Sequence, residues 1–415
     1  MLTWRNYSII NYIIKMTDFE FYSPTQFVFG KQTEQKVGQL AKQYGATKAL
    51  VVYGGGSARK SGLLDRVFKS LEEAGVAYVE MGGVRPNPTE AKVYEGIELA
   101  RSEKVDFLLA VGGGSVIDTV KSIACGVYLD GDFWDLFIGK AKIVKTMSLG
   151  VVLTIPAAGS EGSGNAVITN EKTHQKLGIK HPMILRPRFS IMNPELTMTL
   201  PEWQTASGIC DMIVHILERY FTNTPNTEVA DRLCEGVIKA IVNEGRKVIV
   251  NPQDYDARAN IMWSGMVAHN GTCGPGVEED WSGHQIEHEI SAMYDVTHGA
   301  GLAVVTPSYM TFMAKHHPAR IRQFAERVFD VVESEVTPAE GQTIDEAVAI
   351  EGIRRFKAFL HDDLHLPLTF KELGIENPDI PELTRRLHQN KGEKFGFFYP
   401  ITPDVTAEIY NICLG

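Results

Sequence analysis

The sequence lacks the features that mark secreted, membrane-spanning or nucleic-acid-binding proteins. Its five cysteines are an odd number, widely scattered and without a C-x-x-C pair, which argues against a disulfide framework or a cysteine zinc site. No apolar run reaches about 18 residues, so no membrane span is expected. The net charge of −10 argues against nucleic-acid and anionic-membrane partners, because both favour basic surfaces. These absences favour a cytoplasmic enzyme in a reducing compartment.

Two further motifs are missing. Residues 1–15 are apolar and lightly basic, but they have neither a sustained hydrophobic core nor an A-x-A cleavage site. We therefore expect an N-terminal extension without a functional role and not a signal peptide. The G-x-G-x-x-G fingerprint of dinucleotide-binding proteins is also absent, so any nucleotide site must be argued from other residues.

The apolar pattern changes near residue 200. Before it, short apolar runs such as 106–111 alternate with amphipathic segments, which predicts a parallel β-sheet with helices on both faces. After it, apolar residues recur every three to four positions, which predicts helices. We expect an α/β, Rossmann-like dinucleotide-binding domain over residues 16–200 and an all-α metal- and substrate-binding domain over residues 201–415.

Two glycine runs follow predicted strands, at the strand ends where parallel sheets bind ligands. Gly112–Ser115 opens a helix whose N-terminus suits a phosphate, and Asp118 in that helix can accept from a ribose or amide. Gly54–Ser57 is followed by Arg59 and Lys60 and not by an acidic residue. This second run favours NADP(H), because a carboxylate there would repel a 2′-phosphate. The alternative for either run is a plain tight turn.

The second half of the chain carries five side chains of the kind that bind metals. They form an Asp211-x-x-x-His215 pair, a His284-x-x-x-His288 pair and His298. Residues four apart on a helix share a face, and imidazole with carboxylate suits zinc or iron. The remaining histidines are expected to be hydrogen-bonded core residues: His174, His181, His269, His316, His317, His361, His365 and His388.

Two other interpretations of these residues stay open. His284–His288 fits the H-x-x-E-H zinc-peptidase motif, with Glu287 as the base, although this leaves both glycine runs unused. Glu287 separates the two readings, since it is essential in a peptidase and largely dispensable in a dehydrogenase. A structural metal site in a nucleotide-sensing module is the non-enzymatic alternative.

In its ordered motifs the chain resembles the iron-containing (group III) alcohol dehydrogenases, especially the branch of NADPH-dependent butanol dehydrogenases and broad-range aldehyde reductases. The resemblance rests on Gly54–Ser57, residues 86–89, Gly112–Ser115 with Asp118, the Thr154–Asn165 loop, the Asp211/His215 pair, residues 280–289 and residues 298–307. It implies a dehydroquinate synthase-like fold and hydride transfer between NADP(H) and a small primary alcohol or aldehyde. A polyol oxidoreductase of the glycerol dehydrogenase kind is the alternative on the same fold.

The resemblance also assigns roles to residues. The ligands of one divalent metal, Fe²⁺ or Zn²⁺, become Asp211, His215, His284 and His298, and His288 falls beside the nicotinamide. With the glycine run above, the cofactor contacts become Gly54, Gly55, Gly56, Ser57, Asn87, Gly113, Gly114, Ser115, Asp118, Thr154, Ser160 and Lys176. A homodimer that pairs through a strand within Glu20–Lys31 is expected.

Overall fold

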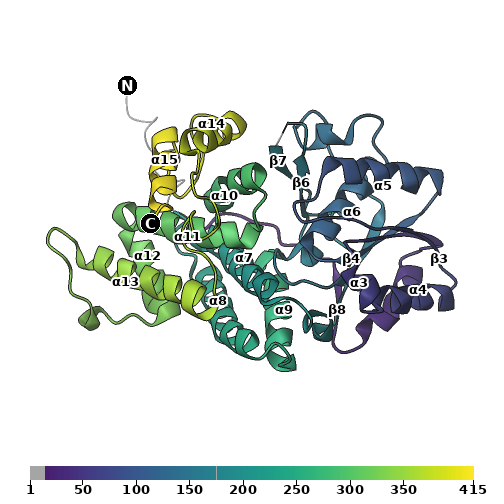
Figure 1. Cartoon of the computed structure of the whole chain (residues 1–415), viewed down its shortest axis with the longest axis horizontal. Helices are drawn as coiled ribbons and strands as arrows, with labels where there is room; N and C mark the ends of the chain where they lie inside the picture. The colour runs from purple at the N-terminus through teal and green to yellow at the C-terminus, as the bar shows by residue number, and fades with distance from the viewer. Residues whose placement is uncertain (1–14, 174) are drawn as a thin grey trace, which may run out of the picture.

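A computed structural model describes residues 15–173 and 175–415. The chain forms a sheet domain, at the right of Figure 1, and a helical domain at its left. The expected N-terminal extension, apart from Lys15, and His174 lie outside the described residues. The sheet's last strand ends at Met192 and the first long helix of the helical domain begins at Glu202.

The central sheet is parallel and has the strand order β1-β8-β5-β4-β2-β3. The strands are β1 (Gln26–Phe29), β2 (Lys48–Tyr53), β3 (Ala77–Met81), β4 (Phe107–Gly112), β5 (Ser148–Leu153) and β8 (Phe189–Met192). The chain leaves β2 toward the edge strand β3, whereas it leaves β4 toward β5 in the opposite direction. Such a reversal opens a ligand crevice outside the carboxyl ends of the strands. Both glycine runs follow the two strands that flank this crevice.

The alternation of side chains along the strands explains why both faces of the sheet are covered. Leu50 and Leu108 pack against α5 (Glu90–Ser102) and α6 (Gly114–Gly126). Their neighbours Val51 and Leu109 point to the other face, against α2 (Val37–Gln43) and α4 (Leu63–Glu73). With a period of two and apolar residues on both faces, β4 is buried along its whole length. The predicted Rossmann-like sheet is confirmed.

An antiparallel hairpin of β6 (Asn165–Asn170) and β7 (Gln175–Lys180) follows β5 and was not expected. It carries Lys176, one of the predicted cofactor contacts, and packs β6 against α6 and β7 against α10 of the helical domain. The hairpin therefore extends the sheet domain toward the predicted metal site.

The second domain is helical, as the apolar spacing predicts. Its helices are α7 (Glu202–Tyr220), α8 (Glu228–Val250), α9 (Tyr255–His269), α10 (Ser282–Tyr294), α11 (His298–His316), α12 (Pro318–Phe329), α13 (Ile344–Ala358), α14 (Ile380–Lys391) and α15 (Pro403–Ile412). In the described chain beyond residue 201 no strand occurs, apart from one bridge between Phe395 and Ile401. Side chains of α7 and α11 are among the most completely buried of a single large core.

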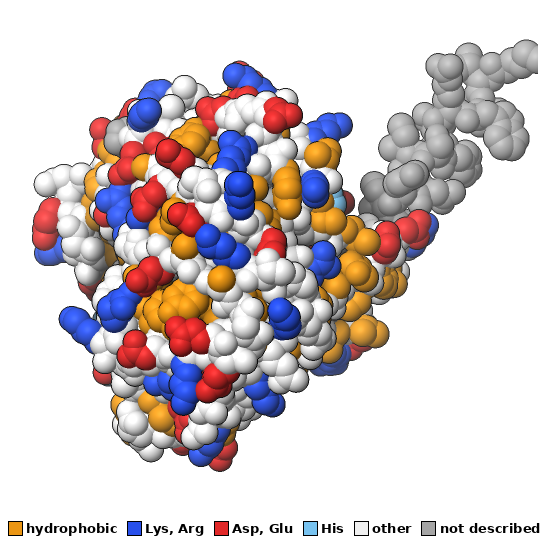
Figure 2. All heavy atoms as spheres, turned by 90° about the vertical axis from the view of Figure 1, so that its right-hand side faces the viewer, with side chains coloured by type: hydrophobic (Ala, Val, Ile, Leu, Met, Phe, Trp, Pro, Cys, Tyr) orange, Lys and Arg blue, Asp and Glu red, His pale blue; other side chains and the backbone are white. Residues whose placement is uncertain are grey.

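The surface agrees with the acidic composition. On the face of the sheet domain that Figure 2 shows, acidic and basic side chains are intermixed and no continuous basic field is visible. Among the described residues, no helix combines the length and the apolar character needed to cross a bilayer.

Candidate metal and cofactor site

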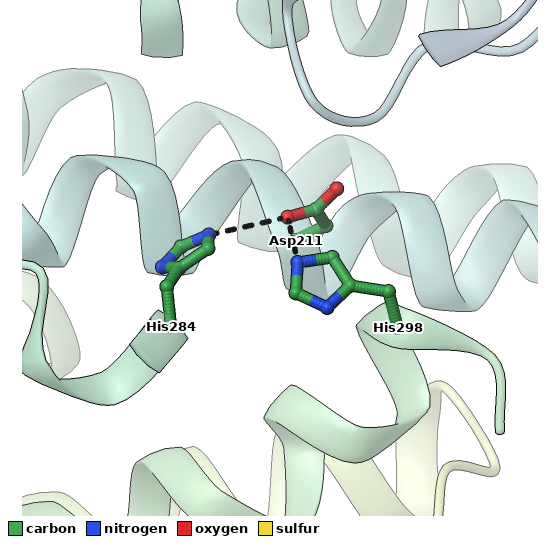
Figure 3. A group of neighbouring side chains, drawn as sticks. All are labelled: Asp211, His284 and His298. Carbon is green, nitrogen blue, oxygen red and sulfur yellow. Dashed lines mark ion pairs between the residues drawn. The ribbon is translucent and has the colours of Figure 1, made fainter. Parts of the chain in front are cut away.

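Three of the predicted metal ligands come together from three different helices. Asp211 lies on α7, His284 on α10 and His298 at the start of α11. Their side chains point toward one another in Figure 3, with Asp211 Oδ1 3.7 Å from His284 Nε2 and 3.9 Å from His298 Nε2. These separations are close to those of ligand atoms that share one metal ion at about 2.0–2.2 Å each. Asp211 and His284 are 73 residues apart in the sequence, and the packing of α7 against α10 brings them together.

Glycines let these helices approach closely enough. A methyl group on Gly299 would overlap the carbonyl oxygen of Ser207 on α7, so the start of α11 can reach α7 only with glycine beside His298. A side chain on Gly301 would likewise collide with the Glu287 carboxylate. The small residues next to His298 thus place its imidazole against Asp211.

Two buried carboxylates orient two of the imidazoles. Glu218 accepts from Nδ1 of His284 at 2.7 Å and from the backbone N–H of the same residue at 2.8 Å. Glu287 accepts in the same way from Nδ1 of His298 and from the hydroxyl of Ser291. Each carboxylate fixes the ring so that Nε2 faces Asp211, which is the arrangement of carboxylate–histidine–metal units in metalloproteins. Neither Glu218 nor this role of Glu287 was identified from the sequence.

The site contains buried polar atoms that the described protein leaves unsatisfied. Asp211 Oδ1 and His284 Nε2 are both inaccessible to solvent, and no hydrogen-bond partner for either lies among the described residues. Burial lowers the pKa of His284, but the nearby carboxylates of Asp211 and Glu218 outweigh this effect and raise the pKa to about 9. A cation at the point where the three side chains meet satisfies both atoms. The donor set therefore fits a divalent metal.

His215, the fourth predicted ligand, lies beside this group. Its Nδ1 is 2.9 Å from the carbonyl oxygen of Asp211, one helical turn back, and 3.0 Å from Asp211 Oδ1. Its ring is 4.4 Å from that of His284, centroid to centroid. Two groups of three ligand atoms within 4.8 Å of one another occur among the described residues: Asp211, His284 and His298, and Glu287, His288 and His298. Neither group contains His215.

His269 is buried and hydrogen-bonded as expected, yet it also belongs to this cluster. Its ring lies 4.4 Å from the His215 ring, and burial lowers its pKa well below the ordinary value. Arg219, which can only donate, is 3.1 Å from Nδ1. The side-chain amide nitrogen of Asn165, on β6, lies 3.0 Å from Nε2 of the same ring. His269 thus joins the metal cluster to the sheet domain, a role the sequence spacing does not show.

His288 lies on α10 one turn beyond His284, with its ring 5.4 Å from the His298 ring. Lys176 of the hairpin contributes a positive charge near it. The ammonium of Lys176 donates to Asn87 Oδ1 at 3.2 Å, and Asn87 Nδ2 donates to Asp295 Oδ1 at 3.0 Å, just before α11. The structure therefore places Asn87, Lys176 and His288 together where the two domains meet.

The crevice in the sheet domain brings several predicted cofactor contacts together. Thr154, at the end of β5, donates its N–H to the carbonyl of Gly112, 3.0 Å away. A side chain on Gly113 would collide with Ile155, so the loop after β5 closes over the glycine turn. Gly113, Gly114 and Ser115 then form the first turn of α6, where free backbone N–H groups favour a phosphate.

Asp118 and Ser160 bind protein groups. The Asp118 carboxylate accepts from Ser160 Oγ at 2.6 Å and from the N–H of Val167 at 2.9 Å. Beside them the fully buried Lys121 donates to oxygens of Ser160, Ser163 and Asn165 at 2.6–3.3 Å. Asp118 and Lys121 hold the 160–165 loop against α6. Lys121 was not identified from the sequence.

We predict that Glu287→Gln weakens metal binding about 10- to 100-fold, because an amide orients the His298 ring and raises its basicity less than a carboxylate does. The measurement is the metal dissociation constant in competition with a chelator. Glu289→Gln is the matched control, since Glu289 is also buried on α10 but binds Asn390 at 2.9 Å and Arg386 at 3.2 Å. Equal losses in both variants would contradict this role. Because Glu287 contacts His298 in this way, we predict that it matters for metal binding, whereas the sequence alone suggested that a dehydrogenase could largely dispense with it.

Comparison with known proteins agrees with the fold and with the clustered ligands. The family description "Iron-containing alcohol dehydrogenase" matches residues 24–194, and "Fe-containing alcohol dehydrogenase family, C-terminal" matches residues 205–411. The chain belongs to the iron-containing alcohol dehydrogenase family. A nicotinamide cofactor and a divalent metal go with this family, as does alcohol dehydrogenase or aldehyde reductase activity. The H-x-x-E-H hydrolase interpretation is wrong, because Glu287 is buried against His298 and residues 24–194 and 205–411 match the dehydrogenase family.

Similar proteins cover nearly the whole chain. A probable NADH-dependent butanol dehydrogenase of Bacillus subtilis is 41% identical over 96% of this chain and 100% of its own length. The NADPH-dependent aldehyde reductase of Escherichia coli is 35% identical over 95% of this chain and 99% of its own. The crystal structure of NADH-dependent butanol dehydrogenase A from Thermotoga maritima superimposes with a TM-score of 0.90 at 40% identity, covering 97% of this chain and 100% of that one.

Proposed function

We propose that this alcohol dehydrogenase interconverts small primary alcohols and aldehydes of about the size of butanol, with NADP(H) as its preferred cofactor. The observation that carries the proposal is the convergence of Asp211, His284 and His298 beside the crevice that ends in Gly112–Ser115. Relatives named as butanol dehydrogenases and as an aldehyde reductase support the substrate class. Their names include both cofactors, so the preference for NADP(H) rests on Ser57, Arg59 and Lys60.

Asp211, His284 and His298 would hold the metal, Fe²⁺ or Zn²⁺, with His215 as the fourth ligand beside them. When bound, the metal supplies Lewis-acid polarisation of the substrate oxygen and the nicotinamide supplies the hydride. Glu218 and Glu287 keep two of the ligand imidazoles in position. Trp281, whose ring lies 5.3 Å from His284 and 5.7 Å from His215, gives the metal site an apolar wall that suits a small aldehyde.

The remaining residues would bind the cofactor and move a proton. Gly113, Gly114 and Ser115 would donate backbone N–H groups to the pyrophosphate. Asn87 and Lys176 meet at the domain boundary, where the nicotinamide end would lie, and Thr154 and Ser160 shape the loop above it. His288 would give a proton to the substrate oxygen during reduction and take it back during oxidation.

We expect His288→Ala to lower kcat about 10²-fold in both directions, because proton transfer by a positioned side chain contributes on the order of 10²–10⁴ to a rate. Steady-state rates of butanal reduction and butanol oxidation measure this, together with the metal content of the variant. His317→Ala is the control, since His317 packs on Phe398 in the helical domain, outside the site. Full turnover of His288→Ala in both directions would remove the role.

The function itself is tested by following NADPH oxidation with butanal, on enzyme as purified and after removal of metal with a chelator. We expect turnover to disappear on stripping and to return with Fe²⁺ or Zn²⁺. Glycerol and 1,3-propanediol as substrates test the polyol alternative. This alternative is supported by the 30% identity of the chain to a 1,3-propanediol dehydrogenase of Citrobacter freundii. Nucleotide binding without turnover of any of these compounds would instead support a nucleotide sensor.

A homodimer and a cytoplasmic location complete the proposal. β1 is the edge strand of the sheet and pairs only with β8 among the described strands, so its other edge is open to a partner strand. Phe29 on β1 and Trp263 on α9 are partly exposed there and contact each other edge to face. All five cysteines are free and buried, which agrees with a reducing compartment.

A further inference from the structure

Three side chains form a hydrogen-bonded group beside the glycine run that follows β2. Arg59 makes an ion pair with Glu80 and donates to the hydroxyl of Tyr53 at 2.9 Å. The same hydroxyl donates to Glu80 Oε2, also at 2.9 Å. The side chains of Arg59 and Glu80 are 50% and 44% exposed, so the pair is open to a ligand. Glu80 comes from the next strand, more than 20 residues beyond the glycine run.

The position of this group in the crevice indicates which part of a dinucleotide it meets. The loop after β5 packs on the helical domain, where the carbonyl of Pro156 lies against Gly208 of α7 and Gly159 lies against His269. The reacting end of the cofactor therefore belongs on the β5 side, next to the metal ligands. With the pyrophosphate at the start of α6, the adenosine end extends to the opposite side, over β2 and β3.

The loop after β3 is joined to the glycine run at that point. Gly83 donates its N–H to the carbonyl of Gly54 at 2.8 Å, and the ring of Tyr53 packs so closely on Gly82 that no side chain fits there. Tyr53, Arg59 and Glu80 thus surround the place where the adenosine ribose would approach Gly54–Ser57.

A carboxylate and a guanidinium recognise different groups at the ribose 2′ position. A carboxylate accepts from the 2′-hydroxyl of NAD(H) and repels the 2′-phosphate of NADP(H), whereas a guanidinium binds the phosphate. In the sequence, no acidic residue stands next to Arg59 and Lys60. In the structure, Glu80 forms an ion pair with Arg59 and neutralises its charge. Lys60, which lies across Gly56, has no acidic partner among the described residues.

We propose that Glu80 and Arg59 form a two-way 2′ subsite that lets this enzyme bind both NADH and NADPH. Glu80 accepts from the 2′-hydroxyl when NADH is bound. Arg59, with Lys60, donates to the 2′-phosphate when NADPH is bound, and Glu80 then turns toward solvent. The inference rests on the proposed function, since it assumes a nicotinamide dinucleotide in this crevice, and it adds NADH as a second cofactor beside NADP(H).

The test is direct titration of the purified protein with NADPH and with NADH, followed by the fluorescence of the reduced nicotinamide, which requires no turnover. We expect E80Q to weaken NADH about tenfold and to change NADPH less than about threefold, and R59Q to do the reverse. The control is E103Q, because Glu103 makes an ion pair with Lys48 at the opposite end of β2.

The inference is overturned if E80Q and R59Q change the two dissociation constants by equal factors, or no more than E103Q does. That result, with wild-type protein still binding the nucleotides and reducing butanal, leaves the proposed function intact. Wild-type protein that binds neither nucleotide would overturn the proposed function and the inference together.

Discussion

Asp211→Asn is expected to lower turnover by at least about 10³-fold and to lose most of the bound metal. An amide has nearly the volume of the carboxylate but lacks its charge, and Asp211 is the one anionic group among the three side chains that converge. Without the metal the substrate oxygen loses its Lewis acid, a contribution of several kcal/mol to the barrier. Metal analysis of the purified variant and butanal reduction at saturating NADPH measure the two effects.

The neighbouring Cys210→Ala provides the control for this variant. Cys210 is completely buried on the same helix, but its side chain points about 100° away from that of Asp211 and packs in the core of the helical domain. We expect Cys210→Ala to keep its metal and its turnover at a modest loss of stability. If Asp211→Asn kept the wild-type metal content, the assignment of Asp211 as a ligand would be wrong.

Lys121→Met is expected to destabilise the protein by about 3–5 kcal/mol, because it removes one partner from a buried set of charges. Asp118 and the completely buried Glu161 would keep their carboxyl groups without a counter-charge. Five hydrogen bonds to the 160–165 loop would be lost as well. Urea unfolding at pH 7 measures the effect, and NADPH affinity should fall because this loop closes over the cofactor crevice.

The pH dependence of stability gives this prediction a second readout. Burial lowers the pKa of Lys121 to about 8, from an ordinary value of 10.5, so the ammonium is still charged at pH 7. Between pH 8 and 10.5 the unfolded chain binds more protons at this residue than the folded protein does, so this residue makes stability rise with pH. Lys121→Met should lack that rise. The control is Lys92→Met, whose surface ion pair with Glu95 should change stability by less than about 1 kcal/mol. A Lys121→Met variant as stable as this control would contradict the prediction.

The fold was largely predictable because the strongest signals are local. Apolar runs such as residues 106–111 end in glycines. A parallel strand that is buried on both faces needs apolar residues along its whole length, so it produces such a run in the sequence. In the helical domain, the spacing of four residues between Asp211 and His215, and between His284 and His288, predicts a shared helix face without knowledge of the tertiary structure. The β6–β7 hairpin escaped prediction because β6 is short and follows a loop of small residues, although Ala166 and Ile168 are buried in it. The residues of β7 are mostly half-buried or exposed, so no clear apolar pattern marks that strand.

The sequence by itself determined the two kinds of domain, the glycine turns at the crevice and the choice of Asp211, His284 and His298 as candidate metal ligands. Only the tertiary structure decided which distant groups support them. Glu218 and Glu287 orient the imidazoles, Lys121 fixes the loop after β5, and Glu80 neutralises Arg59. The physical reason is that hydrogen bonds and charges act through space over a few ångströms. Spacing along the chain reveals a partner only when both residues lie within one turn or one strand.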